Sequence, residues 1–290
     1  PDDVLITAGA AEANFLAITN LIQAGDELIV ESPGWPQAAV LAEGIGAKMK
    51  TIYRREENQW QLDLDELADL ISERTKLIFL TNPNNPTGRI MREPELLKIA
   101  ELADTVGAYL LVDEVYAGLE WTGERVPSVA GLYERGITTS SVSKALGLQG
   151  LRTGWMICRD SQVIFDGVVL RENSSEIMNV MGEKIAEIAL RPERYAQAIA
   201  KAKDEGRTNL ALLDAFIDER PELSWHRPQA GLIGLCRLKL NMEMRSDAFA
   251  RRLLTAPYKT FLIPGTAYGC PQHIRLGVGG GKGVRLEKGL

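Results

Sequence analysis

The most informative part of the chain is a lysine next to two serines, with an arginine close behind. Lys144 ends the run Ser141-Val142-Ser143-Lys144, and Arg152 follows eight residues later. A lysine amine can form a Schiff base with an aldehyde, while serine hydroxyls and a planar guanidinium are suited to a phosphate. The pattern therefore predicts a site for an aldehyde cofactor that carries a phosphate. Alone it is weak, because Ser-x-Ser-Lys also occurs in ordinary loops.

A turn of small residues near the N-terminus is a second candidate phosphate-binding element. The run Thr7-Ala8-Gly9-Ala10-Ala11-Glu12 follows the apolar segment 4–6 and opens a helix-like stretch at 13–21. A strand, a tight turn and a helix start place free backbone N–H groups at one point, which suits a phosphate. A plain strand–turn–helix junction would have the same sequence features, so the turn gains weight only from the other motifs.

Two proline-containing loops follow strand-like segments. The loop Ser32-Pro33-Gly34-Trp35-Pro36 comes after segment 27–30, and Trp35 could either stack on an aromatic cofactor or lie in the core. The loop Asn82-Pro83-Asn84-Asn85-Pro86-Thr87-Gly88 comes directly after segment 77–81. Its two Asn-Pro steps predict an abrupt, rigid turn in which either bond is a candidate for the cis form. Such a loop can direct an asparagine amide at a phenolate oxygen, although a simple turn is the alternative.

An acidic residue ends the most apolar strand-like segment. Asp113 closes the run 110–112, and Tyr116 follows three residues later. A carboxylate in such a place is costly to bury unless it meets a cation. A pyridinium nitrogen would be such a cation, and Tyr116 could then reach the neighbouring oxygen on the same ring.

Taken in order, these motifs resemble those of fold type I pyridoxal-phosphate enzymes of the aspartate-aminotransferase superfamily, within the class I/II aminotransferases. The similarity extends from Val4 to about Gly280. Any one motif could arise by chance, but the whole ordered set is highly specific. Its members are Gly9-Ala10, Pro33-x-Trp35, Asn85-Pro86-x-Gly88, Asp113-x-x-Tyr116, Ser141-x-Ser143-Lys144, Arg152 and Arg275.

The resemblance implies a role for each matching residue, with pyridoxal 5'-phosphate as the cofactor. Lys144 would form the Schiff base and then act as the general base, which requires a lowered pKa. Asp113 would keep the pyridine nitrogen protonated, and Arg275 would bind the substrate α-carboxylate as a bidentate pair. Asn85 and the catalytic Tyr116 would bond the ring oxygen, and Trp35 would stack on the ring. Asn85 and Trp35 would also contact the substrate. The phosphate would be bound by Ser141, Ser143, Arg152 and the backbone amides of Ala10 and Ala11.

The chain departs from the family pattern in two respects. Ala10 and Ala11 stand where relatives often place hydroxyl or amide side chains, so phosphate binding should depend on the backbone, the two serines and Arg152. The chain also begins where the first strand of the large domain would begin. We therefore expect that the N-terminal part of the small domain is absent and that segment 283–290 is the start of a helix.

Composition indicates a globular protein and restricts the classes of partner. The 290 residues are 45% hydrophobic and 25% charged, and 33 basic against 39 acidic residues give a net charge of −6. The sequence has no run of basic residues, which argues against a nucleic-acid partner. No apolar run reaches the length of a membrane helix, which argues against a membrane partner. The three cysteines form no metal or disulfide pattern, which favours a reducing, cytoplasmic location. The family resemblance implies amino acid and 2-oxo acid substrates and a homodimer.

Alternation of strand-like and helix-like segments predicts an α/β fold. We expect a large three-layer αβα domain at 1–205 with a mostly parallel sheet, and the C-terminal part of a smaller α+β domain at 206–290. Strands are expected at 4–7, 27–31, 77–81, 109–113, 137–140, 154–158, 232–240, 260–263 and 274–278. Helices are expected at 12–23, 35–43, 63–72, 94–106, 176–190, 193–217 and 247–254. The motifs would then lie at the carboxyl ends of strands, where such sheets bind ligands.

Transamination between an L-amino acid and a 2-oxo acid is the main functional prediction, and two alternatives remain open. Relatives with the same cofactor residues act as lyases, cyclases or oxidases on amino acids, some of them arginine-like. A third class uses the same fold without catalysis, as the effector-sensing domain of a transcription regulator.

Overall fold

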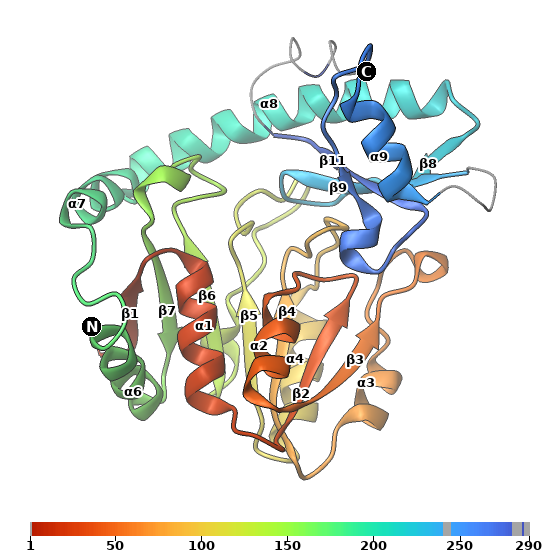
Figure 1. Ribbon diagram of the computed structural model, residues 1–290. Helices are drawn as coiled ribbons and strands as arrows, with labels where there is room; N and C mark the ends of the chain where they lie inside the picture. Colours follow the sequence, from red (N-terminus) through yellow and green to blue (C-terminus); the bar gives the residue numbers. More distant parts are fainter. Residues whose placement is uncertain (1, 240–244, 280–285, 287–290) are drawn as a thin grey trace.

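The computed structural model describes residues 2–239, 245–279 and 286, and its larger part is built on a seven-stranded sheet (Figure 1). The strand order is β1-β7-β6-β5-β4-β2-β3. Neighbouring strands from β6 to β3 are parallel, while β7 runs antiparallel to both β6 and β1. The strands are β1 (Val4–Thr7), β2 (Glu27–Ser32), β3 (Lys48–Tyr53), β4 (Thr75–Thr81), β5 (Tyr109–Asp113), β6 (Gly136–Ser141) and β7 (Gly154–Cys158). The predicted mostly parallel sheet is confirmed.

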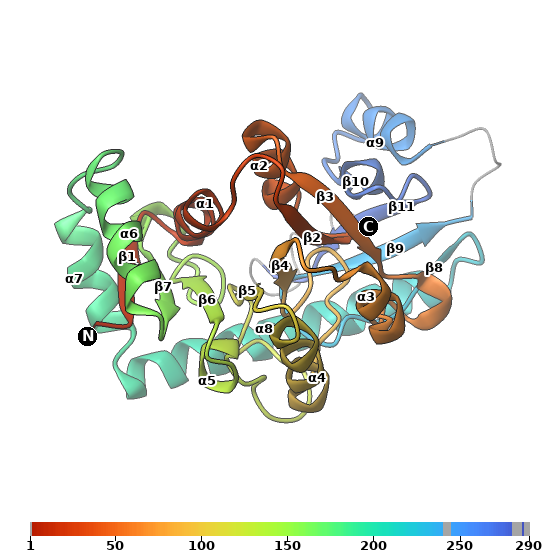
Figure 2. The same ribbon diagram turned by 90° about the horizontal axis from the view of Figure 1, so that it is seen from below.

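Helices cover both faces of this sheet because its central strands are apolar on both sides (Figure 2). On β4, Leu77 and Phe79 belong to one buried cluster, and Ile78 and Leu80 belong to another. The first cluster includes residues of α1 (Ala10–Leu21), α2 (Gln37–Ile45) and α6 (Ser161–Glu172). The second includes residues of α3 (Leu64–Leu70), α4 (Glu93–Asp104) and α5 (Val129–Leu132). The result is the predicted three-layer αβα arrangement.

The smaller α+β part contains a four-stranded antiparallel sheet of order β10-β11-β9-β8. Its strands are β8 (Leu223–Trp225), β9 (Ile233–Leu238), β10 (Ile263–Pro264) and β11 (His273–Gly277), and α9 (Ser246–Leu254) packs beside them. Three short 3-10 helices are η1 (Glu56–Asn58), η2 (Gln149–Leu151) and η3 (Gly265–Tyr268). In the view of Figure 1, the second sheet lies above the side of the large sheet that contains β4, β2 and β3.

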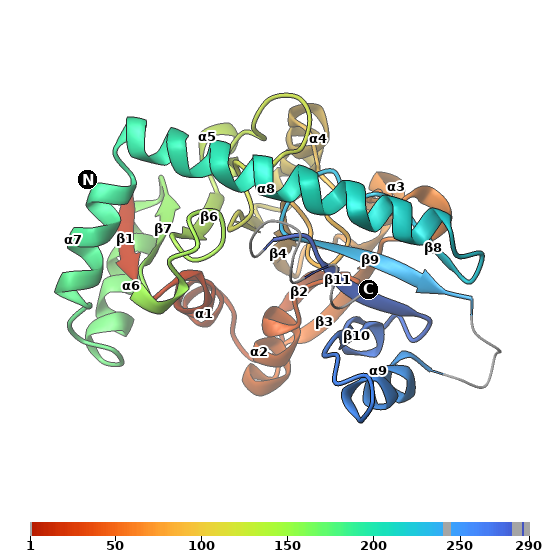
Figure 3. The same cartoon turned by 90° about the horizontal axis from the view of Figure 1, so that it is seen from above.

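A long helix connects the two parts of the structure. α7 (Val180–Ala189) is followed by α8 (Pro192–Asp218), which crosses the molecule and leads into β8 (Figure 3). Pro192 stands in the first turn of α8, where its missing N–H costs no intrahelical bond. In the described part of the chain, neither α8 nor another helix is long and apolar enough to cross a membrane.

Among the strands and α-helices of the described residues, β3, α5, α6 and β8 were not anticipated from the sequence. β3 is an edge strand in which only Ile52 is fully buried, so it has no continuous apolar run. α6 exposes Phe165 and Val169 as well as burying Val163 and Ile164, and this weakens its helical periodicity.

Three further expectations met different outcomes. The strand expected at 260–263 was wrong in position, because pairing with β11 begins at Ile263 and ends at Pro264. The helix expected over 283–290 lies outside the described residues, apart from Leu286. The domain boundary proposed after residue 205 falls within α8, and the division into two domains remains a prediction.

The parallel strands bring three motif-bearing ends together. Thr81, Asp113 and Ser141 are the last residues of β4, β5 and β6, so all three lie at the carboxyl edge of the sheet. Thr81 is paired with Asp113 in register, and Asp113 is paired with Thr139. Loops leaving this edge are where open α/β sheets bind ligands.

Candidate active site

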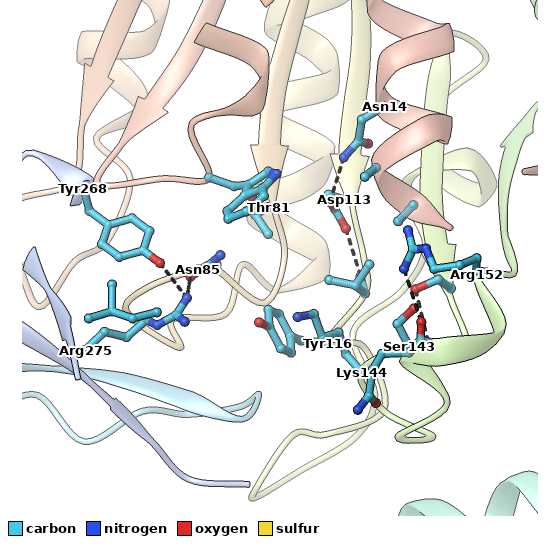
Figure 4. A pocket seen from close by; sticks show the side chains of 17 residues that line it. Asn14, Thr81, Asn85, Asp113, Tyr116, Ser143, Lys144, Arg152, Tyr268 and Arg275 are labelled. Carbon is cyan, nitrogen blue, oxygen red and sulfur yellow. Dashed lines mark hydrogen bonds between the residues drawn. The ribbon is translucent and has the colours of Figure 1, made fainter. Parts of the chain in front are cut away.

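A cavity of about 400 Å³ lies at this edge of the sheet (Figure 4). All eleven site residues predicted from the sequence line it: Ala10, Ala11, Trp35, Asn85, Asp113, Tyr116, Ser141, Ser143, Lys144, Arg152 and Arg275. The sequence analysis missed six further lining residues: Asn14, Thr81, Val115, Gln149, Ile263 and Tyr268. The volume is within the range typical of cofactor and small-molecule sites.

Asp113 places a buried carboxylate at the end of β5. Its side chain accepts hydrogen bonds from Asn14 Nδ2 at 2.8 Å and from the Val115 amide at 3.1 Å. Burial raises the pKa of Asp113, whereas these two hydrogen bonds and the positive charge of Lys144 act in the opposite direction. A carboxylate in this position is suited to hold a cationic group that enters the cavity, such as a protonated ring nitrogen.

Lys144 lies on the loop after β6, and its amine stands 6.0 Å from the centre of the Tyr116 ring. The pKa of Lys144 is lowered, first by desolvation against the surrounding protein and then by the positive charges of Arg275 and Arg152. Asp113 opposes this shift. A lysine with a lowered pKa can supply the neutral amine that attacks an aldehyde or accepts a proton.

The turn before α1 forms an anion-binding cradle with Arg152. Gly9 has φ 88° and caps α1 without a side chain, and the amides of Ala10 and Ala11 donate no hydrogen bond to another described residue. Arg152 Nη2 donates to the Ala8 carbonyl at 2.9 Å. The positive φ favours glycine at position 9, and a Cβ there would lie 2.6 Å from Arg152 Nη2 and displace the guanidinium.

The two serines complete the donor set of the cradle. Ser141 and Ser143 both line the cavity, and the Ser143 amide donates to Ser141 Oγ at 3.3 Å. Free helix N–H groups, hydroxyls and a guanidinium are the groups that proteins use for phosphate. These residues therefore fit the phosphate of the expected cofactor.

A second cationic centre forms where the Asn-Pro loop meets the smaller sheet. Arg275 on β11 donates from Nη1 to Tyr268 Oη at 2.5 Å and to Asn85 Oδ1 at 3.2 Å. Both Asn82–Pro83 and Asn85–Pro86 are cis in this loop. Because Asn85 Oδ1 accepts from Arg275, its Nδ2 remains a donor for another group in the cavity. Burial raises the pKa of the nearby Tyr116 to about 12, so that its hydroxyl stays protonated.

Trp35 forms part of the cavity wall and is 41% exposed. Its Nε1 donates to Gln37 Oε1 at 3.3 Å, and Gln37 Nε2 donates to the Ala11 carbonyl at 2.6 Å. These contacts tie the tryptophan to the first turn of α1. The ring is therefore held beside the cavity by a polar contact rather than by burial in the core.

Asn14, a polar residue on the buried face of α1, could have been recognised from the sequence as a site residue. Asn14 is fully buried on α1 among Ala13, Leu16 and Ala17, and a polar side chain there needs a partner. Nothing in the local sequence indicated that Tyr268 meets Arg275. In the described part of the chain, no group of three or more His, Cys, Asp or Glu side chains could hold a metal ion.

Comparisons with known proteins identify the family of the chain. The model of the family "Aminotransferase class I and II" matches residues 1–289. An aspartate aminotransferase from Pyrococcus horikoshii is 30% identical over 273 residues, which are 92% of this chain and 68% of that protein. A capreomycidine synthase from Streptomyces vinaceus is 26% identical and shares 99% of this chain and 72% of its own length.

Solved structures show the same architecture. The crystal structure of a PLP-dependent aminotransferase from Streptococcus suis superimposes with a TM-score of 0.93 at 32% identity, covering 100% of this chain and 75% of that one. The chain spans about two thirds to just under three quarters of the length of the curated relatives it matches, from 66% to 72%. The family match, the sequence relatives and the shared architecture together lead to one conclusion: the chain belongs to the class I and II aminotransferase family, whose enzymes transfer amino groups with pyridoxal phosphate as the cofactor.

Proposed function

We propose that the protein transfers an amino group from an L-amino acid to a 2-oxo acid with pyridoxal 5'-phosphate held at this site. One observation carries the proposal. A single cavity brings together an amine with a lowered pKa, a buried carboxylate and a guanidinium, on Lys144, Asp113 and Arg275. Those three groups are what covalent attachment of the cofactor, stabilisation of a pyridinium and binding of an amino acid carboxylate each require.

Lys144 has two roles in this proposal. Its amine would hold the cofactor through the aldehyde, and after the substrate had displaced it, Nζ would be the base that accepts the proton from the substrate α-carbon. The neighbouring Arg275 and Arg152 favour the neutral amine that this step needs. When bound, pyridoxal phosphate supplies an electron sink for the charge that develops on the α-carbon.

The remaining residues hold the two reactants in place. The amides of Ala10 and Ala11, the hydroxyls of Ser141 and Ser143, and Arg152 bind the phosphate. Asp113 would hold the ring nitrogen, Trp35 would stack on the ring, and Asn85 Nδ2 and the Tyr116 hydroxyl would donate to the ring oxygen. The unused donors of Arg275 bind the substrate α-carboxylate as a fork, while Tyr268 and Asn85 fix the orientation of its guanidinium.

The decisive experiment follows nitrogen from donor to acceptor. Cofactor-loaded protein would be incubated with ¹⁵N-labelled L-amino acids, one at a time, together with unlabelled pyruvate or 2-oxoglutarate, and the products would be measured by mass spectrometry. Label in the new amino acid and a 2-oxo acid from the donor support transamination. Consumption of the donor without labelled acceptor product contradicts it.

The similarity to the solved structure of a PLP-dependent cyclase, at 26% identity and a TM-score of 0.88, makes a cyclase the second candidate. The same residues that remove the α-proton would serve such an enzyme, since the reactions diverge after that step. In the labelling experiment, an arginine-like donor that yields a product retaining its own nitrogen without label transfer, or uptake of oxygen, supports a cyclase, lyase or oxidase instead.

We also propose that the protein is a homodimer in a reducing cytoplasm. The surface of α6, α7 and the segment between them exposes the large apolar side chains of Phe165, Ile177, Val180 and Met181, at 61%, 81%, 67% and 73%. Large apolar side chains exposed together on neighbouring segments favour association. Cys158, Cys236 and Cys270 are free thiols, as a reducing compartment allows.

Sedimentation velocity and cell fractionation test these two proposals separately. Met181→Glu should shift the protein towards monomer, whereas the same change at exposed Met49 on β3 should not. A wild-type protein that sediments as a monomer at all concentrations contradicts the dimer. Recovery of the protein with a membrane or secreted fraction contradicts the cytoplasmic location.

A further inference from the structure

Asn14 is buried beneath the cavity and directly contacts Asp113. It lies on α1 with no exposed surface, and its Nδ2 donates to Asp113 Oδ2 at 2.8 Å. The two residues are 99 positions apart in the chain, so the contact exists only because α1 packs on a face of the sheet against β5 and β6. A buried amide has to satisfy both its donors and its acceptor, which makes its orientation informative.

The orientation of the Asn14 amide is fixed by a neighbouring strand. Thr139 Oγ1 donates to Asn14 Oδ1 at 2.6 Å, and Thr139 is the residue of β6 paired with Asp113. With the oxygen held by Thr139, the NH₂ group must point towards Asp113. The same NH₂ group donates a second hydrogen bond, at 3.4 Å, to Gln37 Oε1. Gln37 in turn donates to the Ala11 carbonyl, so its own orientation is also determined.

These contacts form one network that reaches three parts of the cavity. From Asp113 the network runs through Asn14 to Gln37, and Gln37 contacts both Trp35 and the first turn of α1 at Ala11. A change at Asn14 therefore acts first on Asp113, which is its charged partner. Hydrogen bonds to a buried charge are about twice as strong as those between neutral groups.

The balance of forces on Asp113 makes this donor important. Burial raises the pKa of the carboxyl, and the hydrogen bond from Asn14 is the largest contribution that opposes this change, ahead of the Val115 amide and Lys144. Removing the Asn14 donor would leave a buried oxygen without a partner and favour the protonated acid. A neutral Asp113 could no longer hold a proton on a ring nitrogen.

We infer that Asn14 is a positioning residue that keeps the Asp113 carboxylate ionised and directed at the ring nitrogen of the cofactor. This inference rests on the proposed function, because it concerns the residue through which that function stabilises the pyridinium. Thr139 supports Asn14 by holding its oxygen. Loss of the donor shifts the shared proton from the ring nitrogen towards Asp113.

The test reads the protonation of the ring nitrogen directly. Wild-type protein and Asn14→Leu would be loaded with pyridoxal phosphate labelled with ¹⁵N in the ring, and the ¹⁵N chemical shift would be recorded across pH. In wild type we expect the protonated signal over the whole stable range. In Asn14→Leu we expect the signal to move towards that of unprotonated pyridine and kcat to fall about ten- to a hundredfold, with KM for the amino acid unchanged.

Matched variants separate this role from a structural one. Asn20→Leu makes the same change on the same helix at a residue whose Nδ2 donates to the Val163 carbonyl and does not line the cavity, so it should retain the wild-type signal. Thr139→Val removes the hydroxyl that holds Asn14 and should give an intermediate shift, while Thr139→Ser should restore the wild-type signal. If Asn14→Leu does not fold, the ¹⁵N signals of Thr139→Val and Thr139→Ser are compared instead.

The outcomes distinguish this inference from the function on which it rests. Borohydride reduction followed by peptide mapping would establish independently whether the cofactor is attached to Lys144. Attachment with a protonated wild-type ring and an unchanged signal in both Asn14→Leu and Thr139→Val overturns the role of Asn14 alone. Failure of attachment, or an unprotonated ring in the wild type, overturns the proposed function together with this inference.

Discussion

Arg275 and Asn85 are hydrogen bonded at 3.2 Å although they lie 190 residues apart in the chain. Arg275 belongs to β11 of the smaller sheet, and Asn85 belongs to the Asn-Pro loop that leaves β4 of the larger one. The contact fixes the proposed carboxylate-binding group relative to the proposed ring-binding group. A substrate held by one is thereby aligned with a cofactor held by the other, which is the main way in which positioning lowers a reaction barrier.

Arg275→Lys tests the bidentate binding of the substrate α-carboxylate by the guanidinium. An ammonium group cannot bond Asn85, Tyr268 and a carboxylate in the same planar arrangement. We expect KM for the amino acid to rise at least about tenfold, which corresponds to the loss of one charge-assisted hydrogen bond. Steady-state kinetics with the donor found by the labelling experiment would measure this change. Tyr268→Phe serves as the control for orientation and should raise KM less. An unchanged KM in Arg275→Lys would place the carboxylate elsewhere.

Lys144→Ala tests the covalent attachment. The variant lacks the only amine that lines the cavity among the described residues, so no Schiff base with the protein can form there. We expect that borohydride reduction no longer fixes the cofactor to the protein. Mass spectrometry of the reduced protein reports the result. Lys201→Ala changes a lysine on α8 outside this cavity and should retain attachment of the cofactor. Cofactor fixed to the Lys144→Ala protein by borohydride would disprove the assignment.

Asp113→Asn tests the ring-nitrogen partner. The amide has nearly the same shape but no charge, and it cannot hold a proton on the pyridine nitrogen. We expect the cofactor to remain bound through Lys144 and the phosphate contacts, while α-proton removal slows by about a hundredfold or more. Exchange of the α-deuteron of a labelled amino acid into solvent measures that step apart from product release. Proton exchange at the wild-type rate would exclude the proposed role of Asp113.

Glu114→Gln tests a pH-dependent contribution to stability from the residue beside Asp113. Burial raises the pKa of Glu114 to about 7 from 4.5, against hydrogen bonds from the Val129 amide and the Thr138 hydroxyl. Because the folded-state pKa is the higher one, the stability gained from binding this proton is complete below pH 4.5 and is lost as the pH rises through about 7. The loss at higher pH amounts to about 3 kcal/mol, on the order of 1.4 kcal/mol per pKa unit.

Glutamine stays neutral, so Glu114→Gln should not show this loss. Urea unfolding at about pH 5 and about pH 8 would measure the free energy of unfolding of both proteins. We expect the free energy of unfolding of the variant, relative to that of the wild type, to be higher at about pH 8 than at about pH 5. Glu124→Gln at an exposed position provides the control, and its difference should be the same at both pH values. Parallel pH profiles for Glu114→Gln and wild type would disprove the effect.

The sequence by itself determined the local chemistry of the site. The motifs at Gly9, Asn85, Asp113 and Lys144 are each contiguous, and each follows a strand-like run, so the strand ends and the residues placed there could be predicted together. Parallel strands have a common carboxyl edge, which is why motifs far apart in the chain were expected at one place. All of the predicted residues line the same cavity.

Only the tertiary structure decided which of these residues touch and which unassigned residues support them. The contact of Asn14 with Asp113 depends on how α1 crosses the sheet, and that of Tyr268 with Arg275 depends on the turn between β10 and β11. No local pattern encodes either contact, because each is set by the packing of elements that are distant in sequence. The same holds for β3, whose pairing with β2 rather than an apolar run of its own makes it a strand.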